Sequence, residues 1–169
     1  MKKYEVFKER CNSFGSYANE RNCSLYVDAE QSFIQYGIES FGQQLTHKYN
    51  VKEKHLIMNG YQCYTKRSEH LVPMEVLCAK TYGYNLGIKL IRGAYMNEER
   101  HLAQTHGYES PIHETIQDTH DCYNNNMKHI LSKLAQNDGV LIGSHNLESV
   151  ELAKNLIKEY SVNSNVIFG

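Results

Sequence analysis

Two positively charged residues interrupt an apolar stretch that otherwise has the character of a buried strand. Residues 87–100 read GIKLIRGAYMNEER, and Lys89 and Arg92 lie within the apolar run. A buried cation without a partner is costly, so each must either extend to solvent or pair with an anion. Residues three apart on a strand point to opposite faces, and we expect these two side chains to diverge. An anionic ligand at the end of this strand would account for both.

Further polar side chains follow the other apolar runs of the chain, where strands would end. Carboxylate, amide, imidazole and phenol groups at such positions can bind a substrate or cofactor and can take part in acid–base chemistry. These residues are Asp28 and Glu30 after the first run, Asn59 and Gln62 after the second, Arg92 and Tyr95 after the third, and His145 and Asn146 after the fourth.

Each of these residues also has a purely structural interpretation. Asp28 could cap the helix that follows it, a role that aspartate fills well. Lys89 and Arg92 could extend past a helix-covered strand to solvent. Gln62 could be an ordinary loop residue, and His145 could donate to a backbone carbonyl. The residues alone leave both interpretations open.

A cluster of possible metal ligands occurs at residues 113–121, which read HETIQDTHD. His113, Glu114, His120 and Asp121 could each bind a metal, but the spacing is not HExxH. On one helix His113 and His120 would lie about two turns apart. We therefore expect the solvated start of a helix here and no metal site.

The segments between the apolar runs have apolar residues every three or four positions, as amphipathic helices require. Short apolar runs alternating with such segments predict βα units and parallel strands. The predicted strands are residues 24–29, 55–59, 87–93, 139–145 and 165–169, and the predicted helices are 1–22, 31–49, 70–85 with Pro73 in the opening turn, and 147–160.

Repeated βα units leave a choice between an open doubly wound sheet and a closed (β/α)8 barrel. A nucleotide-binding doubly wound sheet carries a glycine-rich turn after its first strand, whereas residues 27–33, VDAEQSF, contain no glycine. The repeated polar strand ends favour the barrel. A whole barrel needs eight strands and about 250 residues. We therefore expect part of a TIM-like barrel, with about five of the eight strands.

Charge and cysteine usage exclude several classes of function. The formal net charge is −1 and there is no run of Lys or Arg, so nucleic acid is not an expected partner. The 5 cysteines are odd in number and contain no CxxC pair, which is typical of free thiols in a reducing compartment. No apolar stretch reaches the roughly 18 to 20 residues that span a bilayer.

In their order and spacing, these motifs resemble the proline dehydrogenase family of FAD-dependent enzymes, whose fold is a modified (β/α)8 barrel. The resemblance covers almost the entire chain and is closer to the mitochondrial, eukaryotic branch than to the bacterial bifunctional one. The motifs are LYVDAEQSF (25–33), NGYQCYTK (59–66), KLIRGAYMNEER (89–100), YESPIHETIQDTHDCYNNNM (108–127), SHN (144–146) and VIFG (166–169).

The resemblance implies roles for individual residues. Asp28 matches the aspartate of the proline pocket, and Tyr95 matches the tyrosine that lines it. Lys89 occupies a position where bacterial members commonly have arginine beside the flavin, and lysine keeps the charge but loses the planar fork. The remaining matches are to FAD-binding residues: Gln62 at the flavin ring, Arg92 near the phosphates and ribitol, and His145 and Asn146 at the adenine-nucleotide half.

The reaction implied by the resemblance is oxidation of L-proline to Δ1-pyrroline-5-carboxylate by hydride transfer to FAD, with electrons passed to a quinone. Location in the mitochondrion, on the matrix side of the inner membrane with peripheral contact, follows from the resemblance in the same way. Three alternatives stay open. They are oxidation of hydroxyproline, a catalytically dead remnant that binds a partner, and an unrelated barrel enzyme that uses Asp28 and Lys89 for acid–base chemistry.

Residues 1–169 are expected to form a single, incomplete catalytic domain. The family's first barrel strand supplies a lysine to the substrate carboxylate, and its last helix supplies a tyrosine and an arginine pair. No residues of this chain match those two elements. We therefore expect this chain on its own to be inactive and to expose a sheet edge that promotes aggregation.

Overall fold

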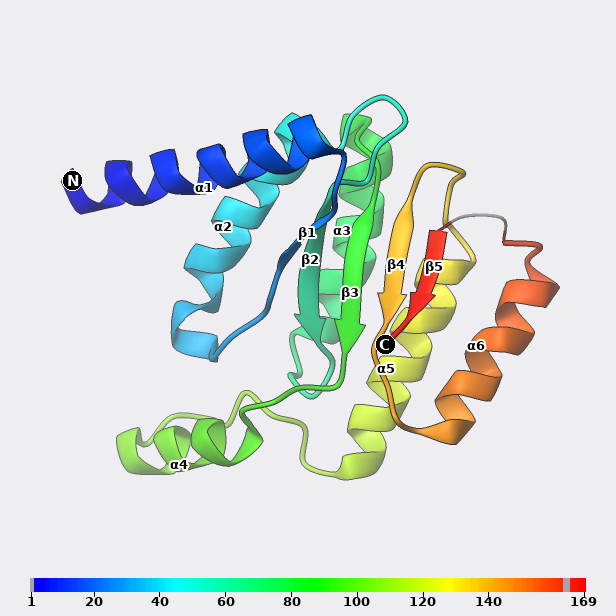
Figure 1. The fold of residues 1–169 in the computed structure, drawn as a ribbon. Helices are drawn as coiled ribbons and strands as arrows, with labels where there is room; N and C mark the ends of the chain where they lie inside the picture. The colour runs from blue at the N-terminus through cyan, green and yellow to red at the C-terminus, as the bar shows by residue number, and fades with distance from the viewer. Residues whose placement is uncertain (1, 163–164) are drawn as a thin grey trace.

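The fold is a five-stranded parallel sheet with helices between the strands, as the computed structural model shows for residues 2–162 and 165–169 (Figure 1). No helix in these residues has the length and apolar character needed to cross a membrane. The elements in chain order are α1 Lys2–Arg21, β1 Leu25–Val27, α2 Ser32–Tyr49, β2 Ile57–Gln62, α3 Ser68–Tyr82, β3 Gly87–Ile91, α4 Met96–His106, α5 Ile116–Leu131, β4 Gly139–Ile142, α6 Leu147–Glu159 and β5 Asn165–Phe168.

The strand order β1-β2-β3-β4-β5 decides between the two predicted folds. A doubly wound sheet reverses its order at a switch point and has helices on both faces. Here the order is sequential, and α2, α3, α5 and α6 lie on one side of the sheet (Figure 1). This is the arrangement of consecutive βα units in a barrel wall, so the barrel prediction is confirmed.

The main core lies between the sheet and the helices that cover it. Ile88 and Leu90 of β3 and Val140 and Ile142 of β4 point to the helices and are almost fully buried. They pack against apolar side chains of α3, α5 and α6, among them Tyr123 of α5. A smaller cluster joins α1 and α2 to the start of β2. Along each of these strands, every second side chain therefore packs against the helices, and the side chains between them point to the concave side of the sheet.

Strand β2 is the most enclosed strand, because all six of its residues are buried. It extends to Gln62, three residues beyond the predicted end at Asn59. The prediction stopped early because Asn59 and Gly60 interrupt the apolar run. Asn59 points outward, and its amide donates to Thr46 Oγ1 of α2 at 3.0 Å. Its side chain is therefore part of the strand–helix packing and not a loop group.

Two other features differ from the sequence-based expectations. Pro73 lies inside α3 and not in its opening turn, because the helix begins two residues before the predicted start, at Ser68. Helix α4 was not predicted, and only the start of α5 was anticipated. Helix α4 is strongly polar and buries only Glu99 and Ala103. Helix α5 does have an apolar face, with Tyr123, Met127 and Ile130 buried in the main core, and the prediction missed it among the polar residues of the helix. The first residue of the predicted helix 1–22 lies outside the described residues.

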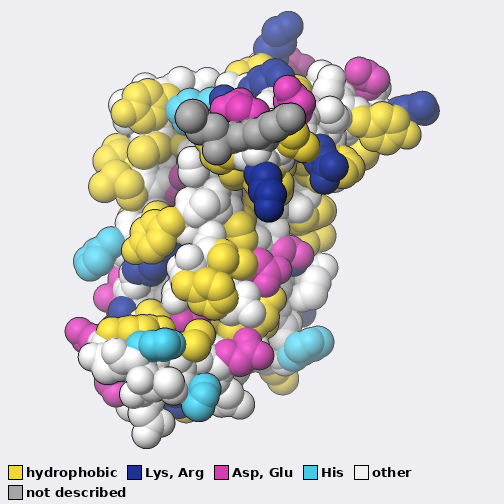
Figure 2. All heavy atoms as spheres, turned by 90° about the vertical axis from the view of Figure 1, so that its left-hand side faces the viewer, with side chains coloured by type: hydrophobic (Ala, Val, Ile, Leu, Met, Phe, Trp, Pro, Cys, Tyr) yellow, Lys and Arg dark blue, Asp and Glu magenta, His cyan; other side chains and the backbone are white. Residues whose placement is uncertain are grey.

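Aromatic side chains are exposed along α1 and the first turns of α2. Phe14 is 66% exposed, Phe33 67% and Tyr36 69%. Figure 2 shows hydrophobic side chains distributed over this side of the molecule, between charged groups. A surface with several exposed aromatic side chains is typical of a region that packs against another part of a protein or a partner.

At the amino-terminal ends of the strands, Asp138 is a structural anchor. Its buried carboxylate accepts hydrogen bonds from Leu86 N and Ala135 N, both at 2.7 Å. Burial raises the pKa of this carboxyl, and the two backbone donors partly oppose that shift. The carboxylate thereby joins the segment before β3 to the segment before β4.

We expect Asp138→Ala to lower the free energy of unfolding by about 1–3 kcal/mol, because buried backbone donors lose their acceptor. Chemical denaturation measures this change. Asp121→Ala is the control, since Asp121 is exposed on α5 and should change stability by less than about 0.5 kcal/mol. Equal stability of the two variants would contradict the anchoring role.

Candidate functional site

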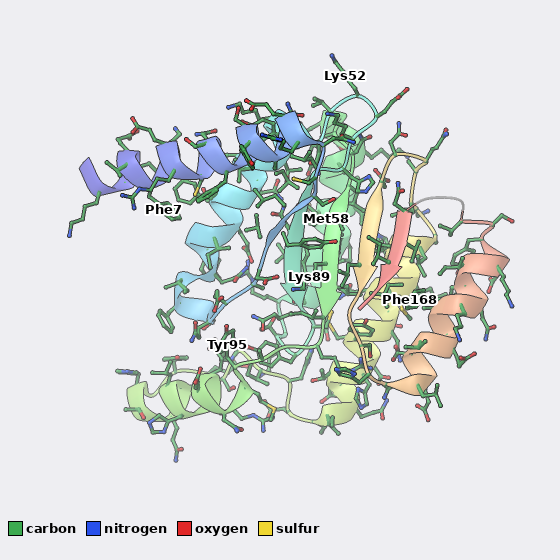
Figure 3. The ribbon with its side chains drawn as sticks, in the orientation of Figure 1. Phe7, Lys52, Met58, Lys89, Tyr95 and Phe168 are labelled. Atoms are coloured by element: carbon green, nitrogen blue, oxygen red, sulfur yellow. The ribbon has the colours of Figure 1, made fainter. Side chains whose placement is uncertain are left out.

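The predicted site residues lie around the carboxyl ends of β1 to β4, as expected for a barrel wall. They form two neighbouring groups. Figure 3 shows Lys89 and Tyr95 toward this end of the strands, with Met58 nearer the middle of the sheet. The first group comprises Asp28, Glu30, Gln62, Lys89 and Tyr95, and the second comprises Arg92, His145 and Asn146.

An ion pair joins β3 to the end of β1 across the strand between them. Lys89 Nζ lies 2.5 Å from Asp28 Oδ1. Lys89 is opposite Gly60 in the β2–β3 register, and Asp28 follows the pair Val27–Asn59 in the β1–β2 register. Since Gly60 has no side chain, the Lys89 side chain can cross β2 to reach the carboxylate. The N-cap of α2 is Gln31, and the partner of the Asp28 carboxylate is Lys89, so the capping interpretation of Asp28 is not supported. The Asp28 side chain is 58% exposed.

Gln62 ties together the loops that follow β1 and β3. Its Nε2 donates to Glu30 O at 2.8 Å, and its Oε1 accepts from Ala94 N at 3.1 Å. Gln62 is 5% exposed, so both bonds are shielded from water. The amide therefore fixes the spacing of the loops that carry Asp28 and Tyr95.

Tyr95 reaches the same loop from the start of α4. Its hydroxyl donates a hydrogen bond to Glu30 Oε2. This bond to a carboxylate is the main reason that the pKa of Tyr95 is raised. The phenol therefore stays protonated as a donor and connects the start of α4 to the loop that carries Asp28.

Arg92 lies on the other side of β3 from the ion pair. Its Nε donates to His120 Nδ1 at 3.0 Å, and its terminal nitrogens donate to Ser144 Oγ at 2.7 Å and Ser149 Oγ at 2.8 Å. The guanidinium also lies 4.2 Å from the centre of the Tyr123 ring. The predicted divergence of Lys89 and Arg92 is confirmed.

The charge of Arg92 is not balanced by a carboxylate among the described residues. All three hydrogen-bond partners are neutral acceptors, and partial burial lowers its pKa. Such a cation is unusual unless an anion binds beside it. Three of the five guanidinium N–H groups are used, which leaves donors for a ligand.

A cleft of about 620 Å³ opens beside Arg92 at the ends of β3, β4 and β5. It is also lined by Lys89, His145 and Asn146. Asn146 caps α6, because its Oδ1 accepts from Ser149 N at 2.9 Å. The cleft thus combines a helix N-terminus with an unbalanced cation, and both favour an anionic group. His145 is exposed at the edge of this cleft.

The predicted set omitted several residues that complete the site. His120, Ser144, Ser149 and Tyr123 hold Arg92, and no local pattern in the sequence marks them as its partners. Glu99 also adjoins the site, because it contacts Ser32 at the start of α2, directly after the β1–α2 loop. The sequence offered one sign of this, because Glu99 in MNEER follows Tyr95 by one helical turn and so would lie on the same side of α4.

The possible metal ligands at residues 113–121 do not converge. Thr115 and Asp118 form a capping box at the start of α5. His113 precedes that helix and is buried rather than solvated, so the expectation for this residue was wrong. Within residues 2–162 and 165–169, no group of three or more His, Cys, Asp or Glu side chains is arranged to hold a metal.

Comparison with known sequences identifies relatives over almost the whole chain. The family model described as Proline dehydrogenase matches residues 3–169. Proline dehydrogenase 1, mitochondrial, of Dictyostelium discoideum is 34% identical over 177 residues, which cover 100% of this chain and 31% of that protein. The Homo sapiens protein of the same name is 37% identical over 153 residues, which cover 89% of this chain and 25% of that protein.

A relative with a different name and two solved structures extend this comparison. Hydroxyproline dehydrogenase of Xenopus laevis is 31% identical over 83% of this chain and 31% of that protein. Proline utilization A of Bdellovibrio bacteriovorus has a TM-score of 0.88 and 17% identity over 97% of this chain and 17% of that one. The same protein from Corynebacterium freiburgense has a TM-score of 0.81 and 24% identity over 97% of this chain and 18% of that one.

The chain spans only a quarter to a third of the length of these curated relatives. The similarity to the two solved structures shows the fold, and a barrel wall of sequential βα units is common to them and to this chain.

Gly60→Ala should distort the site and lower stability by about 1–3 kcal/mol, since overpacked positions are costly. A Cβ at Gly60 would lie 2.7 Å from Ala29 N in the backbone of the β1–α2 loop, which would have to move. Gly37→Ala in α2 is the matched control, because a Cβ there meets open space. That variant should gain about 0.5–1 kcal/mol. Denaturation midpoints that moved in the same direction would contradict this prediction.

Proposed function

The chain belongs to the proline dehydrogenase family, and from that premise we propose that it forms the flavin-binding wall of an enzyme that oxidises L-proline to Δ1-pyrroline-5-carboxylate. The observation that carries this proposal is the convergence of Asp28, Lys89, Gln62 and Tyr95 at the carboxyl ends of three adjacent strands. A dry, well-ordered pocket with charges around the reacting atoms is what hydride transfer requires of the protein.

Asp28 and Tyr95 form the substrate side of the proposed site. The nitrogen of free proline is cationic, and the exposed Asp28 carboxylate is the acceptor that would hold it. The Tyr95 ring would line the pocket, since its hydroxyl is already engaged by Glu30. Lys89 holds the Asp28 carboxylate in place before the substrate arrives.

The residues around Arg92 fit the FAD cofactor of this family. An unbalanced guanidinium beside a helix N-terminus suits a phosphate-bearing group, and His145 and Asn146 line the same cleft. FAD, when bound, accepts the hydride. Arg92, His145 and Asn146 would hold its phosphates and adenine-nucleotide half, whereas Lys89 and Gln62 would adjoin the ring. Lys89 would then stabilise negative charge on the ring after reduction.

The larger assembly is proposed to be a complete barrel in which these strands form a part. Strands β1 and β5 each pair on one side only, and Ile167 on the concave side of β5 is 46% exposed. Further strands that extend the sheet would pair these free strand edges and cover Ile167. The curated relatives are named mitochondrial, and we assign this protein to that compartment, with a quinone as acceptor at the inner-membrane surface.

Hydroxyproline is the second candidate substrate, because one relative of this chain is a hydroxyproline dehydrogenase. The two substrates differ by one hydroxyl group. A pocket that hydrogen-bonds this hydroxyl would discriminate strongly against proline.

Anaerobic flavin reduction in the full-length protein tests the proposed function. The protein should purify with bound flavin, and L-proline should bleach its absorbance faster than hydroxyproline does. Faster bleaching by hydroxyproline would transfer the assignment to the second candidate. Bound flavin that neither amino acid reduces would refute both.

Arg92→Gln should weaken flavin binding about tenfold to a hundredfold, since a charge-assisted contact is lost. Flavin retained on dialysis and its dissociation constant measure this effect. Arg21→Gln is the control, because Arg21 is an exposed arginine on α1 that stacks on Tyr17. Equal flavin affinity in the two variants would remove Arg92 from the cofactor site.

A further inference from the structure

Glu99 in the first turn of α4 is a fully buried carboxylate, with 0% exposure. Its Oε1 accepts from Ser32 N at 2.5 Å, and its Oε2 accepts from Ser32 Oγ at 2.6 Å. The described residues provide no cation for it within ion-pair distance. Burying such a group is costly unless its environment compensates for lost hydration.

The N-terminus of α2 supplies that compensation. Gln31, the N-cap residue of α2, makes no side-chain capping bond, so the first turn lacks an acceptor of its own. Glu99 fills that role from another helix and places negative charge at the positive end of the helix dipole. This arrangement joins α2 to α4, although the two bonded residues are 67 positions apart.

Two contacts side by side connect α4 to the β1–α2 loop. Tyr95 and Glu99 are one helical turn apart, with Glu99 N donating to Tyr95 O at 2.9 Å. Their side chains contact Glu30 in the β1–α2 loop and Ser32, the first residue of α2. The Tyr95–Glu30 contact is partly exposed to solvent, whereas the Glu99 side chain in the Glu99–Ser32 contact is fully buried. The shielded contact is therefore the stronger constraint on how the two segments align.

We propose that Glu99 is a positioning residue that sets the affinity for the amino-acid substrate by holding Tyr95 against the loop that carries Asp28. This inference rests on the proposed function of the site. Without the Glu99–Ser32 contact, the start of α4 is free to shift from the loop. Tyr95 and Asp28 then no longer face the substrate in one fixed geometry, and substrate binding weakens more than the chemical step.

A matched set of variants in the full-length flavoprotein tests this role. Glu99→Ala removes both hydrogen bonds. Glu99→Gln retains them in part, because its carbonyl can accept from Ser32 N and its amide can donate to Ser32 Oγ. Asp138→Ala is the control for lost stability, since it removes a buried carboxylate at the opposite ends of the strands.

The expected result is a KM for proline raised about tenfold in Glu99→Ala, with a smaller change in kcat, and largely restored in Glu99→Gln. Asp138→Ala should lower the melting temperature by a similar amount yet leave KM within about twofold. An equal KM in Glu99→Ala and Asp138→Ala would overturn the inference and leave Glu99 a structural residue only.

Hydrogen exchange supplies a measurement that does not depend on turnover. Glu99→Ala should speed amide exchange in residues 28–34 and 92–100 together, whereas Asp138→Ala should affect the amino ends of the strands. Unchanged exchange in residues 28–34 of Glu99→Ala would overturn the inference. If the wild-type protein carries flavin that proline does not reduce, the proposed function fails, and hydrogen exchange alone decides the role of Glu99.

Discussion

The ion pair between Lys89 and Asp28 depends on a glycine in the strand between them, and the organisation of the site follows from this constraint. In a parallel sheet with sequential order, the ends of β1, β2 and β3 lie side by side. Gly60 leaves room for Lys89 to cross β2, so a cation from β3 can hold a carboxylate from β1. A Cβ at Gly60 would lie 2.7 Å from Ala29 N and 3.3 Å from Asp28 C, so the segment that carries Asp28 would have to move.

Further links stabilise the same alignment. Gln62 at the end of β2 bonds the backbone of both loops, Tyr95 bonds the β1–α2 loop, and Glu99 bonds the first residue of α2. On the far side of β3, Arg92 is held by neutral partners and keeps its charge available. The site therefore has two parts with β3 between them, a cross-linked part that we propose holds the substrate and a part around Arg92 that we propose binds an anionic group. This division matches the needs of an enzyme that holds an amino acid against a phosphate-bearing flavin.

The parts of this arrangement that could be predicted from sequence are those with local signals. Apolar runs identified all five strands, polar residues at their ends drew attention to Asp28, Gln62 and Arg92, and Lys89 stood out as a cation inside an apolar run. The sequential strand order could be predicted only as the better of two options, because composition does not specify which strands pair. Contacts such as Glu99–Ser32, between residues 67 positions apart, leave no periodic or spacing signal. The burial of His113 was missed for the same reason, since its neighbours come from other elements.

A double-mutant cycle of Asp28→Asn and Lys89→Met in the full-length flavoprotein tests the central claim most directly. The quantity to measure is the dissociation constant for proline, taken from the change in the flavin spectrum on binding. If Lys89 acts by holding Asp28 across Gly60, the two substitutions should be coupled by about 1 kcal/mol or more. Effects that add within about 0.3–0.5 kcal/mol would show that the two residues act independently and would contradict this organisation of the site.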